Sequence, residues 1–161
     1  MAAAPPPEEE ASWLHGHAHE PNPLPPPGDG AFVVRLPGGE EQVVSPAALA
    51  ALPQCEVPGC LIVSTGHGAS GPFTFGGVRL ADLLAQAAGD WRSVDVVSAD
   101  GFGTRLLPAH LADEGAGPIL LALRCDGAPL TRAGGLVRLI VPSEREDALR
   151  QVKWVARVEV R

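Results

Sequence analysis

The apolar positions of the chain first form a regular pattern at residues 32–44. A β-prone run from Phe32 to Leu36 is followed by a Pro-Gly-Gly turn at residues 37–39 and by a second short run from Gln42 to Val44. Glycine and proline between two β-prone runs favour a tight connection. The pattern therefore predicts a β-hairpin at the start of the folded part.

Two short helices are predicted, one from a capping residue and one from helical spacing. Ser45 before a proline is typical of an N-cap, and a helix from Ala47 to Leu52 is expected to follow it. Leucine and alanine recur at helical spacing from Leu80 onward, which predicts a second helix as far as Ala88. Gly89 is expected to stop this helix.

The other apolar runs are short and rich in β-branched residues, so they predict strands. Cys60 to Ser64 is a continuous run of the kind buried on both faces, and it leads into a glycine-rich loop from Thr65 to Gly71. Asp126 followed by glycine is a tight-turn signal. Further strands are expected at Val94–Ser98, Ile119–Leu123, Val137–Val141 and Val152–Val160.

Strands outnumber helices in this sequence, and the two do not alternate as they would in a βαβ protein. We therefore predict an α+β domain with mixed, mostly antiparallel sheets and a few short helices. A length of 161 residues fits one domain, because such a chain can bury one core but hardly two. The domain is expected to span residues 31–161.

Residues 1–30 are rich in proline, alanine and glutamate and have neither a helical nor a strand period. Ordering such a segment would cost more conformational entropy than its burial could return, so a disordered tail is expected. His15, His17 and His19 alternate there and would share one face of an extended chain, where they could hold a divalent ion. Solvated histidines without a metal are the favoured interpretation, because nothing preorganises the ligands.

The net charge of -7 becomes small once the tail is set apart. Five acids and no Lys or Arg precede residue 31, which leaves 14 acids and 12 bases in the domain. Without a basic excess, nucleic acid is not expected as a partner. Eleven of the bases are arginine, whose guanidinium can hold a phosphate or carboxylate with two hydrogen bonds, so a small anionic ligand is a candidate partner.

Neither a membrane span nor a secretory signal is expected. No apolar run reaches the roughly 20 residues of a membrane helix. The first residues are alanines, prolines and glutamates rather than a basic patch and an apolar stretch. Three cysteines, Cys55, Cys60 and Cys125, are too few and odd in number for a disulfide framework. We therefore expect reduced thiols and a cytoplasmic protein.

The glycine-rich segment suggests two kinds of chemistry. Residues 66–71 fit the pattern GxGxxG, which cradles a dinucleotide pyrophosphate when a helix follows, but proline and further glycines follow here and disfavour that site. Ser64 near His67 is compatible with a hydrolase, because a serine nucleophile needs a base beside it. The G-x-S-x-G elbow is absent, so the hydrolase is kept only as a minor alternative.

Two cations interrupt apolar surroundings late in the chain. Arg138 lies inside the predicted strand Val137–Val141, and Lys153 lies near the start of the last strand. A cation among buried neighbours is costly unless an anion or a polar network compensates it. Either the side chains extend to the surface, which is the better interpretation of one isolated cation, or they hold an anionic ligand.

The motifs around these cations occur in a distinctive order: DGAPL at residues 126–130, GGLVRLIVP at 134–142 and VKW at 152–154. This order resembles the "nGxPL, HGxPxRlvvP, VKW" ending of the molybdopterin-binding domain in the sulfite oxidase family. LAALP at residues 49–53, the segment 76–84 and ADGF at 99–102 are similar to upstream motifs of that family. The resemblance covers nearly all of residues 32–161.

The resemblance implies the family's fold and its molybdenum cofactor, molybdopterin. It implies that Arg138 and Lys153 hold the pterin and phosphate of this cofactor, with the backbone near Gln151 and Val152 assisting. An anionic cofactor would compensate the two cations.

The family's metal-ligating cysteine falls on Ser64 or Thr65 in this chain, and the resemblance implies that the following loop, with Gly66 and His67, faces the metal. A hydroxyl is a poorer ligand than a thiolate and stays protonated at neutral pH, which weakens the case for oxo transfer. Two hypotheses stay open. The first is a molybdopterin-binding oxidoreductase-type protein. The second is a non-catalytic module that uses the same fold for another anionic ligand, a protein partner or a second copy of itself.

Overall fold

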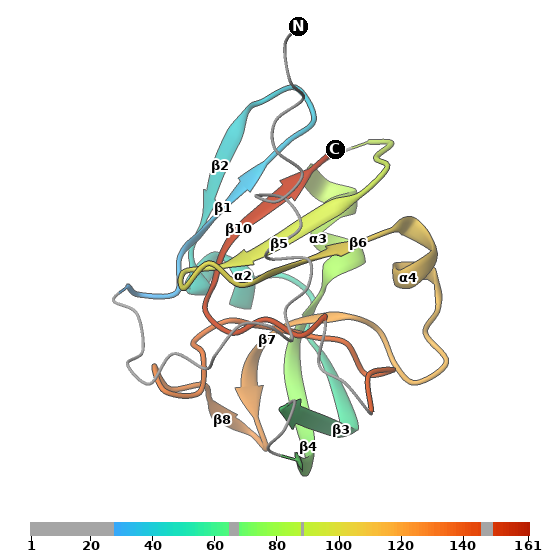
Figure 1. Cartoon of the computed structure of the whole chain (residues 1–161). Coiled ribbons are helices and arrows are strands. Elements are labelled where there is room, and N and C mark those ends of the chain that lie inside the picture. Colours follow the sequence, from blue (N-terminus) through green and yellow to red (C-terminus); the bar gives the residue numbers. More distant parts are fainter. Residues whose placement is uncertain (1–27, 65–67, 88, 146–149) are drawn as a thin grey trace, which may run out of the picture.

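The computed structural model describes residues 28–64, 68–87, 89–145 and 150–161. Two sheets lie one above the other in Figure 1, and short helices pack beside them. Neither sheet alternates with helices, so the α+β class with mixed, mostly antiparallel sheets is confirmed. In the part of the chain that is described, no helix is both long and apolar enough to cross a membrane.

The first sheet, called sheet A, joins the two ends of the domain. The first and last of its strands in the chain pair in parallel, with Val34 opposite Val158, and its other pairings are antiparallel. The predicted hairpin and the Val94–Ser98 strand are confirmed within it. Its strands, in spatial order, are β2 (Glu41–Val44), β1 (Phe32–Arg35), β10 (Val155–Val160), β5 (Val94–Ser98) and β6 (Gly103–Leu106).

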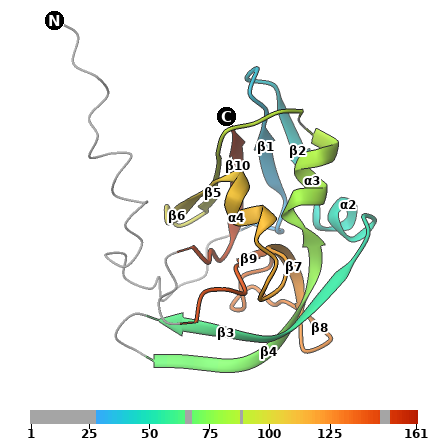
Figure 2. The ribbon, with the colours of Figure 1, turned by 90° about the vertical axis from the view of Figure 1, so that its right-hand side faces the viewer.

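The second sheet, called sheet B, contains a long hairpin whose two strands run side by side along the base of the molecule in Figure 2. The tight turn predicted at Asp126 is confirmed, since Asp126 has a φ of 51° and Gly127 a φ of 83°. The strands of sheet B are β3 (Cys55–Ser64), β4 (Gly68–Arg79), β7 (Leu120–Cys125) and β8 (Ala128–Pro129), with β9 (Arg138–Ile140) paired to β7.

Three helices are assigned among the described residues: α2 (Pro46–Ala50), α3 (Leu80–Ala87) and α4 (Pro108–Ala112). The first two confirm the predictions, and the Ser45 hydroxyl accepts a hydrogen bond from the backbone N–H of Ala48 at 3.0 Å, as an N-cap does. The sequence pattern did not predict α4, which is only five residues long.

The predicted loop from Thr65 to Gly71 is wrong in its second half, because β4 already begins at Gly68. Cross-strand pairing with β3 keeps this segment extended, with Ser70 opposite Ile62. Gly71 is needed at the close approach of the two strands, since a Cβ there would lie 2.8 Å from the carbonyl oxygen of Cys60. Residues 65–67 lie outside the described part.

Alternation along the strands separates two apolar clusters. The larger one fills the space between the sheets, where Val94, Val96, Val158 and Val160 point inward from sheet A. The smaller cluster lies on the far face of sheet B, and it contains Val57, Cys60, Phe75, Leu120, Ala122 and Ile140. Successive residues of β7 contribute to both clusters, so this strand is buried on its two faces in its first half.

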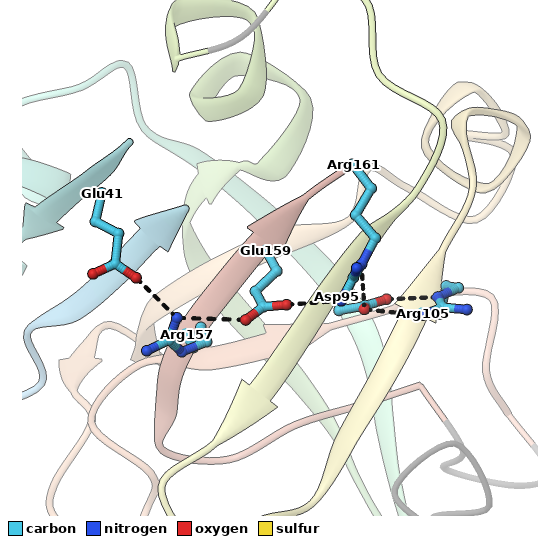
Figure 3. Close-up of polar contacts among 6 residues, drawn as sticks. All are labelled: Glu41, Asp95, Arg105, Arg157, Glu159 and Arg161. Carbon is cyan, nitrogen blue, oxygen red and sulfur yellow. Dashed lines mark hydrogen bonds and ion pairs between the residues drawn. The ribbon is translucent and has the colours of Figure 1, made fainter. Parts of the chain in front are cut away.

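The outer face of sheet A carries a chain of ion pairs that we call the ion ladder (Figure 3). Its centre is Asp95, which is 1% exposed and accepts hydrogen bonds from Arg105 Nε at 2.7 Å and Arg161 Nε at 3.2 Å. On the other side, Glu159 pairs with both Arg161 and Arg157, and Arg157 also pairs with Glu41 of β2 at 3.1 Å. The ladder therefore extends from β2 to β6, the two edge strands of sheet A, without a residue of β1.

Candidate functional site

Strand alternation places Arg138 on the far face of sheet B. Leu139 of β9 enters the larger cluster, while its neighbour Ile140 and, by the same alternation, Arg138 turn to the smaller cluster. The guanidinium carbon of Arg138 lies 5.8 Å from the centre of the Phe75 ring. The cation therefore rests on an aromatic side chain at the margin of an apolar cluster.

Little compensates the charge of Arg138. One terminal nitrogen donates to the carbonyl oxygen of Gly134 at 3.3 Å, and Nε is buried without a hydrogen-bond partner in the described part of the protein. Burial lowers the pKa of Arg138 to about 10, because the charged form loses its hydration. An anion at this position would remove the penalty.

Lys153 lies close to Arg138. Its Nζ atom is 5.5 Å from the centre of the neighbouring Trp154 ring. The pKa of Lys153 is lowered, first by partial burial and then by the positive charge of Arg138, while the Asp100 carboxylate acts more weakly in the opposite sense. The two cations therefore repel each other, although the Lys153 side chain is exposed to solvent.

The two side chains meet beside Gly135. A Cβ on Gly135 would lie 2.8 Å from Arg138 Cγ and 3.5 Å from Lys153 Cβ, and its φ of +111° is one that L side chains rarely adopt. Neither cation forms an ion pair with any acid that the structure describes. We call Arg138 and Lys153 the cation pair. Two like charges that are offset only weakly, by the Asp100 carboxylate, favour the binding of an anion.

A cavity of about 270 Å³ opens beside Arg138 on the far face of sheet B. Its volume is smaller than the roughly 300–1,000 Å³ of small-molecule pockets, so the cavity would hold only part of a ligand. Its walls are mainly apolar, with one thiol and the guanidinium of Arg138, and they are formed by Ile62, Phe73, Phe75, Cys125, Ala128, Pro129, Leu130, Thr131, Gly134 and Arg138.

Gln151, two positions before Lys153, is hydrogen-bonded to β3. Its side-chain amide donates to the carbonyl oxygen of Leu61 at 3.2 Å, and its buried Oε1 has no hydrogen-bond partner among the described residues. The backbone of Val152 exchanges two hydrogen bonds with Leu139, at 2.8 and 3.2 Å, so its N–H is already donated within the protein. The predicted cofactor contacts of Gln151 and Val152 stay predictions.

Of the residues predicted to face the metal, only some lie within the described part of the chain. Ser64 ends β3, where its backbone pairs with Gly68, while Thr65, Gly66 and His67 lie outside the described part. The histidines at positions 15, 17 and 19 lie outside it as well. The roles predicted for Ser64, for the glycine loop and for the minor hydrolase alternative therefore stay predictions.

The described residues do not form a metal centre. No group of three His, Cys, Asp or Glu side chains comes together in the described ranges. The three cysteines are free thiols, as expected. Burial raises the pKa of Cys60 and of Cys125, which favours the neutral thiol over the metal-binding thiolate. Hence the site fits the anionic, organic end of a cofactor such as molybdopterin, but the described residues do not provide a thiolate for its metal.

Sequence reasoning gave no role in this site to two of its residues, Gly135 and Phe75. Gly135 sets the spacing of the cation pair, and Phe75 supports the guanidinium from below. The consecutive glycines at 134 and 135 before an arginine-containing strand were a usable signal for the first. No local signal linked Phe75 to Arg138, because β4 and β9 lie on either side of β7 and are brought near each other only by the fold.

Comparison with known proteins gives one family and one fold. Residues 43–161 match the model of the family described as "Oxidoreductase molybdopterin binding domain". Among solved structures, the chain is similar to the sulfane dehydrogenase SoxCD from Paracoccus pantotrophus, with a TM-score of 0.67 and 18% sequence identity. The match covers 90% of this chain and 45% of that one, so the chain spans less than half of the relative. At this identity the likeness shows a shared fold. No curated protein matches the sequence.

Proposed function

Since the chain belongs to the oxidoreductase molybdopterin-binding domain family, we propose that it binds a phosphorylated pterin of the molybdopterin type. In this proposal the cation pair holds the phosphate, and the apolar cavity beside Arg138 takes an adjoining part of the ligand. One observation supports it above all: Arg138 and Lys153 converge on Gly135, and neither has an acidic partner among the described residues.

The chemistry of the two side chains suits a phosphate monoester. Arg138 can donate two parallel hydrogen bonds to phosphate oxygens, and Lys153 adds a compact second charge. A dianion would offset both the burial of Arg138 and its repulsion of Lys153. Since hydrogen bonds to charged groups contribute about 1.5–3 kcal/mol each, loss of either cation should weaken binding at least about tenfold.

The bound cofactor would bring a redox-active metal to the protein. The side chains assigned here bind and orient its organic end, and the place of the family's cysteine falls on a hydroxyl residue, Ser64 or Thr65. We therefore assign no redox step to this chain. Cytoplasmic location is part of the proposal, and the three free cysteines, Cys55, Cys60 and Cys125, suit a reducing compartment.

A second candidate is a non-catalytic binding module with the same cation pair. The hydroxyl residues in place of the cysteine favour it, because they remove the thiolate that would anchor the metal. Such a module would hold another phosphorylated or carboxylated ligand, or a protein partner or second copy that presents an acidic group. The two candidates share the anion site and differ in the occupant.

The test is the pterin and molybdenum content of the full chain purified from a host that makes the cofactor. Pterin near one per chain, lost in Arg138→Gln and in Lys153→Gln, would support the proposal. Arg35→Gln is the matched control, because it removes one exposed arginine at the end of β1 in sheet A, on the opposite side of the main core from the cation pair.

The remaining outcomes also decide between the candidates. Wild-type protein that lacks pterin but binds inorganic phosphate, with binding lost in Arg138→Gln, would favour the second candidate. Wild-type protein with neither pterin nor phosphate affinity would overturn both, because the cation pair would then hold no anion.

A further inference from the structure

The backbone around Lys153 departs from regular strand pairing. Val152 and Leu139 exchange two hydrogen bonds, so a regular antiparallel ladder would place the N–H of Trp154 on the carbonyl of Val137. The N–H of Val155 occupies that carbonyl instead, at 3.0 Å. One extra residue is therefore inserted here, as in a β-bulge, and a bulge redirects a side chain.

Trp154 is the residue whose backbone conformation departs from that of a regular strand. Its φ of 48° lies in the left-handed region, which a bulky side chain rarely adopts. Its backbone N–H donates to the carbonyl oxygen of Gly135 at 3.0 Å. This bond joins the bulge directly to the glycine that separates Arg138 from Lys153.

The side chain of Trp154 makes a second connection to the same turn. Its indole N–H donates to the carbonyl oxygen of Arg132 at 2.6 Å, and the N–H of Gly135 donates to that same oxygen at 3.2 Å. The indole is 7% exposed, so its N–H would be left buried and unpaired if this bond were lost. The carbonyl of Arg132 therefore accepts hydrogen bonds both from the bulge and from the turn before β9.

The geometry points to Trp154 as the positioning residue of the anion site, and we propose that it holds Lys153 beside Arg138 against their mutual repulsion. This inference rests on the proposed function, because it assumes that the two cations share one anion. Lys153 is exposed to solvent, so without the indole bond it would be free to move away from Arg138. The anion would then meet one cation instead of two.

The test measures the dissociation constant of inorganic phosphate by calorimetry in a low-salt, phosphate-free buffer. We expect Trp154→Phe, which keeps an aromatic ring and removes the N–H donor, to weaken binding about tenfold, within the coupling range of contacting residues. In a Lys153→Gln background the same change should weaken binding less than about twofold, since the positioned charge is already gone. Trp91→Phe is the matched control, because Trp91 packs partly buried against the larger cluster away from the site.

A merely structural role would give a different pattern. Equal weakening in both backgrounds, or unchanged binding in Trp154→Phe, would overturn the inference while the anion site stands. Absence of phosphate binding in the wild-type protein would instead overturn the anion site itself. If Trp154→Phe does not fold, 3-benzothienylalanine at position 154 keeps the ring shape and lacks only the N–H, and the same criteria apply.

Discussion

The ion ladder and the cation pair differ in whether their charged groups have partners of opposite charge. In the ladder, Asp95 is almost fully buried, yet two arginines donate to it. In the cation pair, Arg138 and Lys153 lie beside one glycine, and neither has an acidic partner among the described residues. The ladder is compensated within the protein, so its role is to hold sheet A together. The cation pair is offset only by the weak effect of Asp100 and by the hydration of the exposed Lys153, so an external anion would stabilise it.

The largest expected effect comes from breaking the centre of the ladder. Asp95→Asn should lower the free energy of unfolding by about 2–3 kcal/mol, because it removes the buried counter-charge of Arg105 and Arg161. Urea unfolding followed by circular dichroism measures this. Asp113→Asn, at an exposed position, should change little. A cost below about 1 kcal/mol for Asp95→Asn would mean that the ladder does not depend on its buried acid.

Removing a cation should have a different result in each region. Arg138→Met should leave the free energy of unfolding unchanged or raise it by about 1 kcal/mol in phosphate-free buffer, because it replaces an uncompensated buried charge with an apolar side chain. Arg105→Met should be destabilising, since it takes from Asp95 its bidentate partner. If both variants lost the same free energy of unfolding in the same unfolding experiment, the two regions would not differ in the way proposed.

A smaller effect concerns pH. The pKa of Lys153 is lowered in the folded protein, so its charge destabilises the fold at neutral pH. As pH rises through the folded pKa toward 10.5, the folded protein releases the proton first, and its stability should rise relative to Lys153→Gln. The gain should stay below about 1 kcal/mol, because solvent screens this partly exposed group. Paired unfolding curves from pH 8 to about 10.5 measure it, and a falling difference would contradict the assigned direction.

The smallest effect is expected at the exposed end of the ladder. Glu41→Gln should change the free energy of unfolding by less than about 0.5 kcal/mol, because the side chains of Glu41 and Arg157 are 48% and 38% exposed and solvent screens their pair. Thermal unfolding at low and at high salt provides the measurement. A loss comparable with that of Asp95→Asn would show that the ladder acts as one cooperative network.

Local signals predicted much of the fold. The hairpin around residues 37–39, the N-cap at Ser45 and the turn at Asp126 follow from the preferences of a few neighbouring residues, and the structure confirms them. The family resemblance drawn from the late motifs is confirmed by the match over residues 43–161. The sequence did not predict two features that depend on longer-range contacts, the parallel pairing of β1 with β10 and the late start of β10 at Val155. Hydrophobic pattern does not specify which strand lies beside which.

The candidate site shows the same limit. Sequence reasoning singled out Arg138 and Lys153 because cations stood among apolar residues, and motif order gave them a phosphate to bind. It expected a regular strand from Val152, and so it did not detect the bulge at Trp154. At that bulge the indole of Trp154 donates a hydrogen bond to Arg132, which is 22 positions away in the chain.

By itself, the sequence determined the local turns, caps and strand faces of this protein, together with the identity of its charged residues. Only the tertiary structure decided which of those charges acquire a partner. Arg157 is hydrogen-bonded to Glu41, 116 positions away in the chain, while Arg138 lies against the ring of Phe75 and is repelled by Lys153. The physical reason is that an ion pair requires atoms within a few ångströms, and that proximity is created by strand pairing rather than by neighbouring residues.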